Sequence, residues 1–84
     1  MSDRFPVRVQ LFGRHREIVG SSVVELELEA GGTVADLRGL LAAHPVLGDW
    51  LGGSAIAVNR RYERDESVVA AGDEVAIIPP VAGG

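Results

Sequence analysis

Two stretches of the chain alternate between apolar and polar residues, and each alternation predicts a β-strand with one buried face. The first strand runs from 5 to 12, and Pro6 lies near its beginning, where a proline is tolerated. Its apolar positions are Phe5, Val7, Val9 and Leu11. The second strand runs from 21 to 29, with apolar positions at Val24, Leu26 and Leu28. The mostly polar connection from 13 to 20 has room for one helical turn.

The polar face of the second strand consists of three glutamates, Glu25, Glu27 and Glu29. Charged side chains along a strand keep it soluble and protect it against pairing with strands of other molecules. This interpretation is favoured over the alternative that the acidic face docks a basic partner.

One main helix is predicted after Gly31-Gly32, which ends the second strand. Thr33 suits the N-cap position, and Asp36 suits the second half of a capping box. Apolar residues then follow at helical spacing, namely Val34, Leu37, Leu40 and Leu41. The helix is expected to end near His44, because the residue before a proline disfavours the α conformation.

The pattern of residues in the second half of the chain predicts a loop and three short strands. The loop covers 45–54, and its apolar residues are expected to pack against the edge of the core: Val46, Leu47, Trp50 and Leu51. The strands cover 55–58, a short return strand that begins at Tyr62 after a turn at 59–61, and 74–78. Val68 and Val69 make a brief apolar contact between the last two strands.

The predicted order is strand, strand, helix, strand, short strand, strand. One main helix then covers one face of a mixed sheet of four to five strands, which makes an α+β domain. In so short a chain this is the β-grasp, or ubiquitin-like, arrangement. We assign the β-grasp domain to residues 1–78 and a flexible C-terminal tail to residues 79–84.

Composition and charge exclude several classes of function. The 84 residues contain no Cys, which excludes disulfides and thiol chemistry, and no Lys, which excludes Schiff-base chemistry. A net charge of −4 without a basic stripe argues against a nucleic-acid partner. The chain has no apolar run long enough for a signal peptide or a membrane span, so we expect a cytoplasmic protein with no membrane partner.

The side chains offer no evident catalytic group. His15 is expected in a solvated loop, and His44 at the helix end, where a partly positive ring suits the helix dipole. Neither histidine has the spacing of a catalytic triad or a metal site, so no bound metal is predicted. Three arginines, Arg60, Arg61 and Arg64, alternate with acidic residues, which is typical of a mixed solvated surface rather than an anion site.

The last eight residues are the candidate site: Ile77, Ile78, Pro79, Pro80, Val81, Ala82, Gly83 and Gly84. The proline pair favours an extended exit from the last strand, and the glycines tolerate a close approach of their backbone to another surface. This segment suits a narrow slot on a partner, and we expect the two isoleucines to help dock it. The alternative is a frayed chain end without function.

The carboxylate of Gly84 is the distinctive reactive group of this tail. A carboxylate is a poor electrophile, so it must be activated, for instance as an acyl-adenylate, before a nucleophile attacks it. The chain has no nucleotide-binding loop. We therefore expect no bound cofactor, ATP use by a separate activating partner, and a carrier that moves between proteins.

From 72 to 84, Gly-Asp-Glu-Val-Ala-Ile-Ile-Pro-Pro-Val-Ala-Gly-Gly, the chain resembles the small sulfur-carrier subunit of molybdopterin synthase. Looser similarity at 7–16, 33–37 and 57–59 extends the resemblance over nearly the whole chain. It implies that a ubiquitin-activating-like enzyme adenylates Gly84 and that a sulfur donor converts it to a thiocarboxylate. The tail then inserts into the large subunit, where Gly84 gives its sulfur to cyclic pyranopterin monophosphate.

The same resemblance implies a heterotetramer of two small and two large subunits, with the catalytic side chains in the large subunit. The small subunit is then a non-catalytic part of a sulfurtransferase. The ending Val81-Ala82-Gly83-Gly84 is also close to that of sulfur carriers in thiamine and cysteine biosynthesis, although Pro80 favours the molybdopterin assignment. A ubiquitin-like modifier and a β-grasp interaction module with an inert tail stay open as alternatives.

Overall fold

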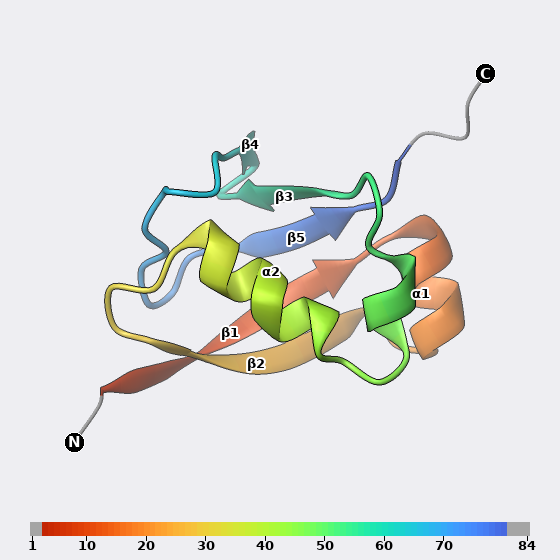
Figure 1. Ribbon diagram of the computed structural model, residues 1–84, viewed down its shortest axis with the longest axis horizontal. Helices are drawn as coiled ribbons and strands as arrows, with labels where there is room; N and C mark the ends of the chain where they lie inside the picture. The colour runs from red at the N-terminus through yellow and green to blue at the C-terminus, as the bar shows by residue number, and fades with distance from the viewer. Residues whose placement is uncertain (1–2, 81–84) are drawn as a thin grey trace.

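Eight short elements build two layers, with the main helix on one face of a sheet (Figure 1). The computed structural model describes residues 3–80. In chain order its elements are β1 (Arg4–Leu11), α1 (Gly13–Val19), β2 (Val23–Glu29), α2 (Val34–Ala42), the 3-10 helix η1 (Leu47–Trp50), β3 (Ala55–Val58), β4 (Arg61–Tyr62) and β5 (Val75–Ile78). Helix α2 crosses the sheet, whereas α1 and η1 lie at the end of the sheet toward which β1 and β5 run.

The five strands are arranged in the order β2-β1-β5-β3-β4. The first and last strands of the chain, β1 and β5, pair in parallel at the centre, with Val9 opposite Val75 and Leu11 opposite Ile77. All other pairs are antiparallel. The predicted α+β fold, with a mixed sheet under one main helix, is therefore confirmed.

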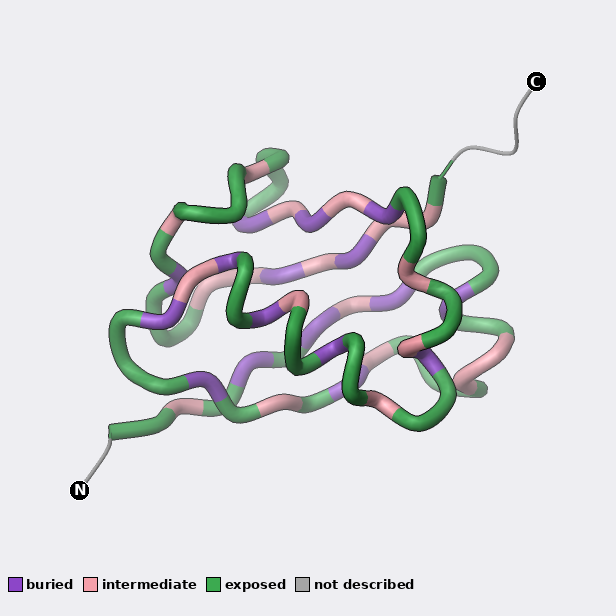
Figure 2. The backbone as a smooth tube through the Cα atoms, in the orientation of Figure 1, coloured by how far each residue is buried: buried purple, intermediate pink, exposed green. Residues whose placement is uncertain are grey.

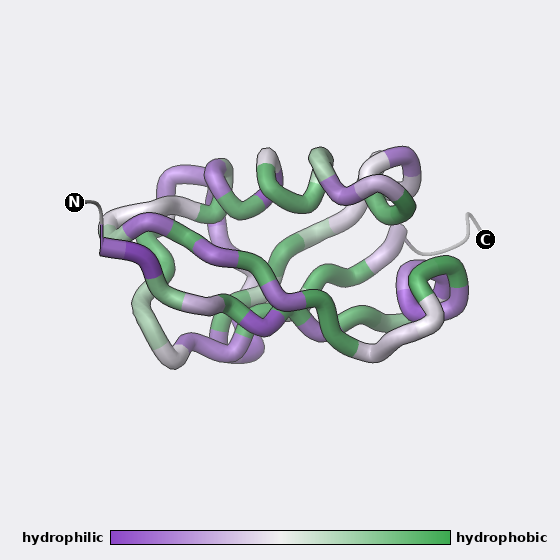
Figure 3. Tube along the Cα trace, turned by 90° about the horizontal axis from the view of Figure 1, so that it is seen from below, coloured by the Kyte–Doolittle hydropathy of each residue, from purple (hydrophilic) through white to green (hydrophobic). Residues whose placement is uncertain are grey.

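The core lies between α2 and the sheet, where the inward residues of both layers meet (Figure 3). Buried and more exposed positions alternate along the strands (Figure 2), as the sequence pattern predicts. Fully buried residues include Val9, Val34, Leu37, Leu41 and Ile77. Each such side chain stabilises the fold by about 1.5–3 kcal/mol relative to exposure, so this interface supplies most of the driving force for folding.

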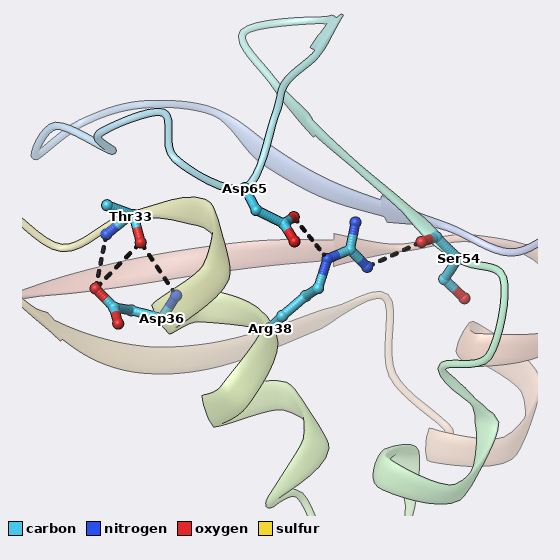
Figure 4. A network of polar contacts seen from close by, with 5 residues as sticks. All are labelled: Thr33, Asp36, Arg38, Ser54 and Asp65. Atoms are coloured by element: carbon cyan, nitrogen blue, oxygen red, sulfur yellow. Dashed lines mark hydrogen bonds and ion pairs between the residues drawn. The ribbon is translucent and has the colours of Figure 1, made fainter.

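The predicted start of the main helix is confirmed. The Thr33 N–H donates to Asp36 Oδ2 at 2.9 Å, and Thr33 Oγ1 accepts from the Asp36 N–H at 3.3 Å (Figure 4). These reciprocal bonds form a capping box, which satisfies backbone donors that the first helical turn leaves free. The helix ends at Ala42, two residues before the expected position. Leu40 was predicted on the buried face, but it is 37% exposed.

The connection from 13 to 20 forms a seven-residue helix, α1, rather than the single turn expected. Gly20 ends this helix in the left-handed conformation, with φ of +78°, and its N–H donates to the Arg16 carbonyl oxygen at 2.9 Å. One face of this helix lies against the rest of the molecule. Its residues follow each other at helical spacing and are His15, Ile18 and Val19.

The loop after α2 is only partly packed as expected. Leu47 is fully buried and Leu51 packs against the core, but Val46 and Trp50 are 43% and 44% exposed. His44 Nδ1 accepts the backbone N–H groups of Val46 and Leu47 at 3.1 and 3.0 Å. His44 therefore holds the turn after α2 through two hydrogen bonds to the backbone. No helix within residues 3–80 is long and apolar enough to cross a membrane.

Candidate functional site

The two isoleucines that lead into the tail face opposite sides of the sheet. Ile77 has no exposed surface and belongs to the core, whereas Ile78 is half-buried on the face that α2 leaves open. We expected both to help dock a partner. That expectation is wrong for Ile77, because a fully buried side chain cannot contact another protein, and it remains a prediction for Ile78.

Two glycines lie against the proline pair where the chain leaves the sheet. A Cβ on Gly13 would lie 3.4 Å from Pro79 Cγ, and a Cβ on Gly53 would lie 3.5 Å from Pro80 Cβ. Both glycines have positive φ, +50° and +75°, where residues with side chains are strained. The root of the tail, Pro79-Pro80, is therefore flanked by the start of α1 and by the loop before β3.

His15 joins these two flanking segments. Its ring is fully buried, and Nε2 lies 2.9 Å from the Trp50 carbonyl oxygen and 3.2 Å from Ser54 Oγ. Because a carbonyl oxygen only accepts, Nε2 carries the ring proton, and Nδ1 is a buried atom with no partner among the described residues. The expectation that His15 lies in a solvated loop is wrong, since the ring ties α1 to the segment between η1 and β3.

Arg38 holds the same segment from the other side (Figure 4). Its Nε donates to Asp65 Oδ1 at 3.1 Å, and one terminal nitrogen donates to the Ser54 carbonyl oxygen at 3.0 Å. Ser54 is thus fixed by its backbone to α2 and by its side chain to α1. A loop that carries two glycines, Gly52-Gly53, gains a defined position beside the tail root through these bonds.

An open cleft of about 580 Å³ lies at the tail root. The prolines form part of its lining, and Gly13, Arg14, Asp49 and Trp50 form most of the rest. The Arg14 guanidinium lies over the Trp50 ring, 5.5 Å from the ring centre, which is a cation–π geometry. The cleft therefore has one aromatic wall with a cation on it, and His15 also contributes to its lining.

A second surface beside the tail root exposes aromatic side chains. On the open face of the sheet, Phe12 is 43% exposed and Tyr62 is 73% exposed. They border a shallow depression of about 340 Å³ together with Ala57, Ala76 and Ile78, and its lining also includes the polar residues Gln10, Arg60 and Glu74. Exposed aromatic residues around half-buried small ones are typical of protein-binding surfaces. This surface, which we call the open-face strip, is continuous with the strand that carries the tail.

The other candidate residues do not form a site. Within residues 3–80 no three acidic or histidine side chains come together in a way that could hold a metal ion. Arg60 forms an exposed ion pair with Glu74 at 3.6 Å, and Arg61 lies in β4. The remaining tail residues, Val81, Ala82, Gly83 and Gly84, lie outside the described residues.

Comparison with known proteins identifies the family. The model of the ThiS family matches residues 9–84. The chain belongs to the ThiS family. This membership agrees with the resemblance found in the sequence, and the matched region includes β5, the tail root and the tail.

Three known proteins are similar to this chain over nearly its whole length. The molybdopterin synthase sulfur carrier subunit of Chlamydomonas reinhardtii is 38% identical over 81 residues, which cover 93% of this chain and 98% of the relative. The crystal structure of small archaeal modifier protein 1 from Haloferax volcanii superposes with a TM-score of 0.78 at 31% identity, over 94% of this chain and 99% of that one. A chain in the complex of subunits 1 and 2 of the molybdopterin-converting factor from Helicobacter pylori superposes with a TM-score of 0.67 at 30% identity, over 95% and 100%.

The residues that flank Pro79 and Pro80 were not predicted from the sequence. The signal for α1 was present in the helical spacing of His15, Ile18 and Val19. The charged residues between them suggested a solvated connection. The roles of Gly13 and Gly53 depend on contacts with the far end of the chain, for which the sequence gives no local signal.

Proposed function

We propose that this chain is the sulfur-carrier subunit of molybdopterin synthase and acts in the biosynthesis of the molybdenum cofactor. The observation that carries the proposal is the match of 38% identity over 98% of the length of a relative of that name. The fold supports it, because the last strand lies at the centre of the sheet and directs the proline pair out of the domain.

The chemistry takes place at the Gly84 carboxylate. A partner enzyme uses ATP to convert the carboxylate to an acyl-adenylate, and pyrophosphate leaves. Sulfur at the oxidation level of sulfide then attacks the carbonyl carbon, AMP leaves, and the product is a thiocarboxylate. The carrier contributes the terminus and its presentation, and the partner supplies the nucleotide site.

The large subunit of molybdopterin synthase is the proposed acceptor. Its slot receives the tail, and the Gly84 thiocarboxylate gives its sulfur to cyclic pyranopterin monophosphate. Two such transfers complete the dithiolene. The open-face strip supports this step, because Ile78, Phe12 and Tyr62 offer an apolar contact beside the tail root. The Helicobacter pylori relative is itself described as part of a complex of two subunits.

The test is an intact-mass measurement. The protein is incubated with ATP, a sulfide source and a cognate activating enzyme, and then with the large subunit and the pterin substrate. We expect a mass gain that matches one oxygen replaced by sulfur, followed by its loss when the pterin is converted. A variant without Gly84, or with one residue added after it, should fold normally and gain nothing. An unchanged mass with an enzyme that activates another carrier would contradict the proposal.

A protein modifier is the second candidate function. The observation in its favour is the superposition on the small archaeal modifier, whose TM-score of 0.78 exceeds the 0.67 of the molybdopterin-converting factor chain. A modifier forms isopeptide bonds between its terminus and lysines of other proteins. A ladder of conjugates that depends on Gly84 would support this function, and the absence of conjugates beside a thiocarboxylate would support the first one.

A further inference from the structure

Within residues 3–80, strand β2 lies at the end of the sheet and pairs only with β1, so its outer edge is free in this part of the chain. Two backbone hydrogen bonds show which positions of β1 and β2 are bonded to each other. The Leu11 N–H donates to the Ser22 carbonyl oxygen, and the Ala30 N–H donates to the Asp3 carbonyl oxygen. In an antiparallel pair, bonded and non-bonded positions alternate. The backbone groups of Glu25 and Glu27 therefore point away from β1, and within residues 3–80 no other strand lies beside them.

A groove of about 490 Å³ runs beside this edge, between β2 and α2. Its lining includes the apolar residues Leu28, Ala35 and Leu40, of which Leu40 is 37% exposed, and the charged residues Arg4, Glu27, Glu29 and Asp36. A Cβ on Gly39, also in the lining, would meet nothing within 4 Å. The groove therefore offers apolar contacts with acidic groups beside them, and open space for side chains of a strand added to β2.

The other face of β2 carries the three exposed glutamates. Across the pair, Arg8 lies opposite Glu25, and Arg4 lies opposite Glu29 and forms an ion pair with it at 3.6 Å. Glu27 lies opposite Pro6, so β1 offers it no cation directly across the pair. The acidic face is thus incompletely neutralised at its centre.

We propose that the β2 edge and its groove bind an extended segment of another protein by strand addition, and that this segment alternates apolar and basic side chains. Because side chains of neighbouring strands pair on each face, the apolar residues lie in the groove beside Leu40, and the basic residues lie beside the glutamates. A second copy of this chain does not fit, because pairing β2 with β2 places glutamate beside glutamate.

The proposed site is independent of sulfur transfer. The groove is lined by residues from the start of β1, the end of β2 and α2. Figure 1 shows that the start of β1 and the end of β5, which leads into the tail root, lie at opposite ends of the sheet. A protein bound at β2 therefore leaves the tail root and the open-face strip free. A partner can hold the carrier by this edge while another protein acts on its terminus.

The test uses the full chain, isotope-labelled for NMR, and three synthetic peptides. The first alternates valine and arginine, the second has the same composition with the valines and arginines in separate blocks, and the third alternates valine and glutamate. At about 150 mM salt, where exposed charges are screened, we expect only the first to bind, with amide shifts at Glu25, Glu27 and the exposed side of α2. The proposal would be overturned if the first two peptides bound equally well or if none bound up to about 1 mM. It would also be overturned if the amide shifts were confined to the open-face strip.

Two variants test the two halves of the site. Glu27→Arg should weaken binding of the valine–arginine peptide roughly tenfold, because an attractive cross-strand pair becomes repulsive. Gly39→Trp should block the groove without disturbing the exposed helix surface. Glu66→Arg, an equal change of charge at an exposed residue in the loop after β4, is the matched control and should bind normally. Unchanged binding by both site variants, with the fold intact by NMR, would refute the strand-addition site.

Discussion

His15 Nε2 lies 3.2 Å from Ser54 Oγ, and both side chains are buried beside the root of the tail. This contact links residues from α1 and from the segment before β3, which flank Pro79 and Pro80. The two segments that flank the tail root are thus joined by a polar contact inside the molecule.

Replacing His15 by alanine should destabilise the domain by about 2–4 kcal/mol, because the change leaves a cavity and removes the hydrogen-bond partner of the buried Ser54 hydroxyl. Urea unfolding followed by circular dichroism measures this loss. Arg16→Ala in the same helix is the control, since Arg16 is exposed and its replacement should change the free energy of unfolding by less than about 0.5 kcal/mol. Equal stabilities of the two variants would contradict a structural role for His15.

The two isoleucines of β5 should respond differently to the same substitution. Ile77→Asp places an unpaired charge in the core and should prevent folding. Ile78→Asp should fold but weaken binding to the proposed large subunit by roughly 30-fold, as expected for a residue central to an interface. Titration calorimetry with the purified large subunit gives the dissociation constants.

The control for Ile78 is Val68→Asp, because Val68 is also an apolar residue, is 65% exposed and is not part of the open-face strip. It should bind the large subunit like the unchanged protein. A folded Ile78→Asp variant with normal affinity would remove the open-face strip from the proposed interface and leave the tail as the remaining contact.

The strands and α2 were predictable because their signals are local. Alternation of apolar residues in β1 and β2 follows from the geometry of a strand with one buried face, and Thr33 and Asp36 identify the start of α2 by the bonds they make to each other. The same alternation also separates Ile77 from Ile78, so the assignment of both to a docking surface overlooked a signal that the sequence contains.

The burial of His15 could not be read from its neighbours. Its partners, Trp50 and Ser54, lie 35 and 39 residues away in the chain, and a short segment rich in arginine suggests solvent exposure. Likewise, the tail was recognisable from its prolines and glycines, whereas the glycines that flank it, Gly13 and Gly53, become informative only when the fold brings them beside Pro79 and Pro80.

Replacing either of two glycines by alanine should change the stability of the domain, but in opposite directions. Gly39 lies inside α2, where a Cβ would meet nothing within 4 Å, so Gly39→Ala should stabilise the domain by about 0.5–1 kcal/mol through its better helix propensity. A Cβ on Gly48 would fall against the backbone carbonyl oxygen of Ala42, closer than real contacts allow. Gly48→Ala should therefore cost about 1–3 kcal/mol. Thermal unfolding of both variants tests the prediction, and it would be contradicted if both melting temperatures changed in the same direction.

The turn between β3 and β4 contains a residue in an unfavourable conformation. Asn59 and Arg60 both have positive φ, +53° and +68°, as a two-residue hairpin turn requires. Asn59 is held there by its side chain, which donates to Asp73 Oδ1 at 3.1 Å and accepts from the Glu74 N–H at 2.9 Å. Arg60 has only an ion pair to Glu74 at 3.6 Å, and its side chain is 88% exposed, so that pair contributes little.

Replacing Arg60 by glycine should therefore stabilise the domain, because glycine adopts positive φ without the strain that a Cβ introduces. We expect a gain of about 0.5–1 kcal/mol, which raises the melting temperature by roughly 2–8 °C in a domain of this size. Asn59→Gly is the informative control, since it relieves similar strain but removes both side-chain hydrogen bonds, and it should not stabilise. Calorimetry gives the melting temperatures of the two variants. A lower melting temperature for Arg60→Gly than for the unchanged protein would mean that the ion pair to Glu74 outweighs the backbone strain.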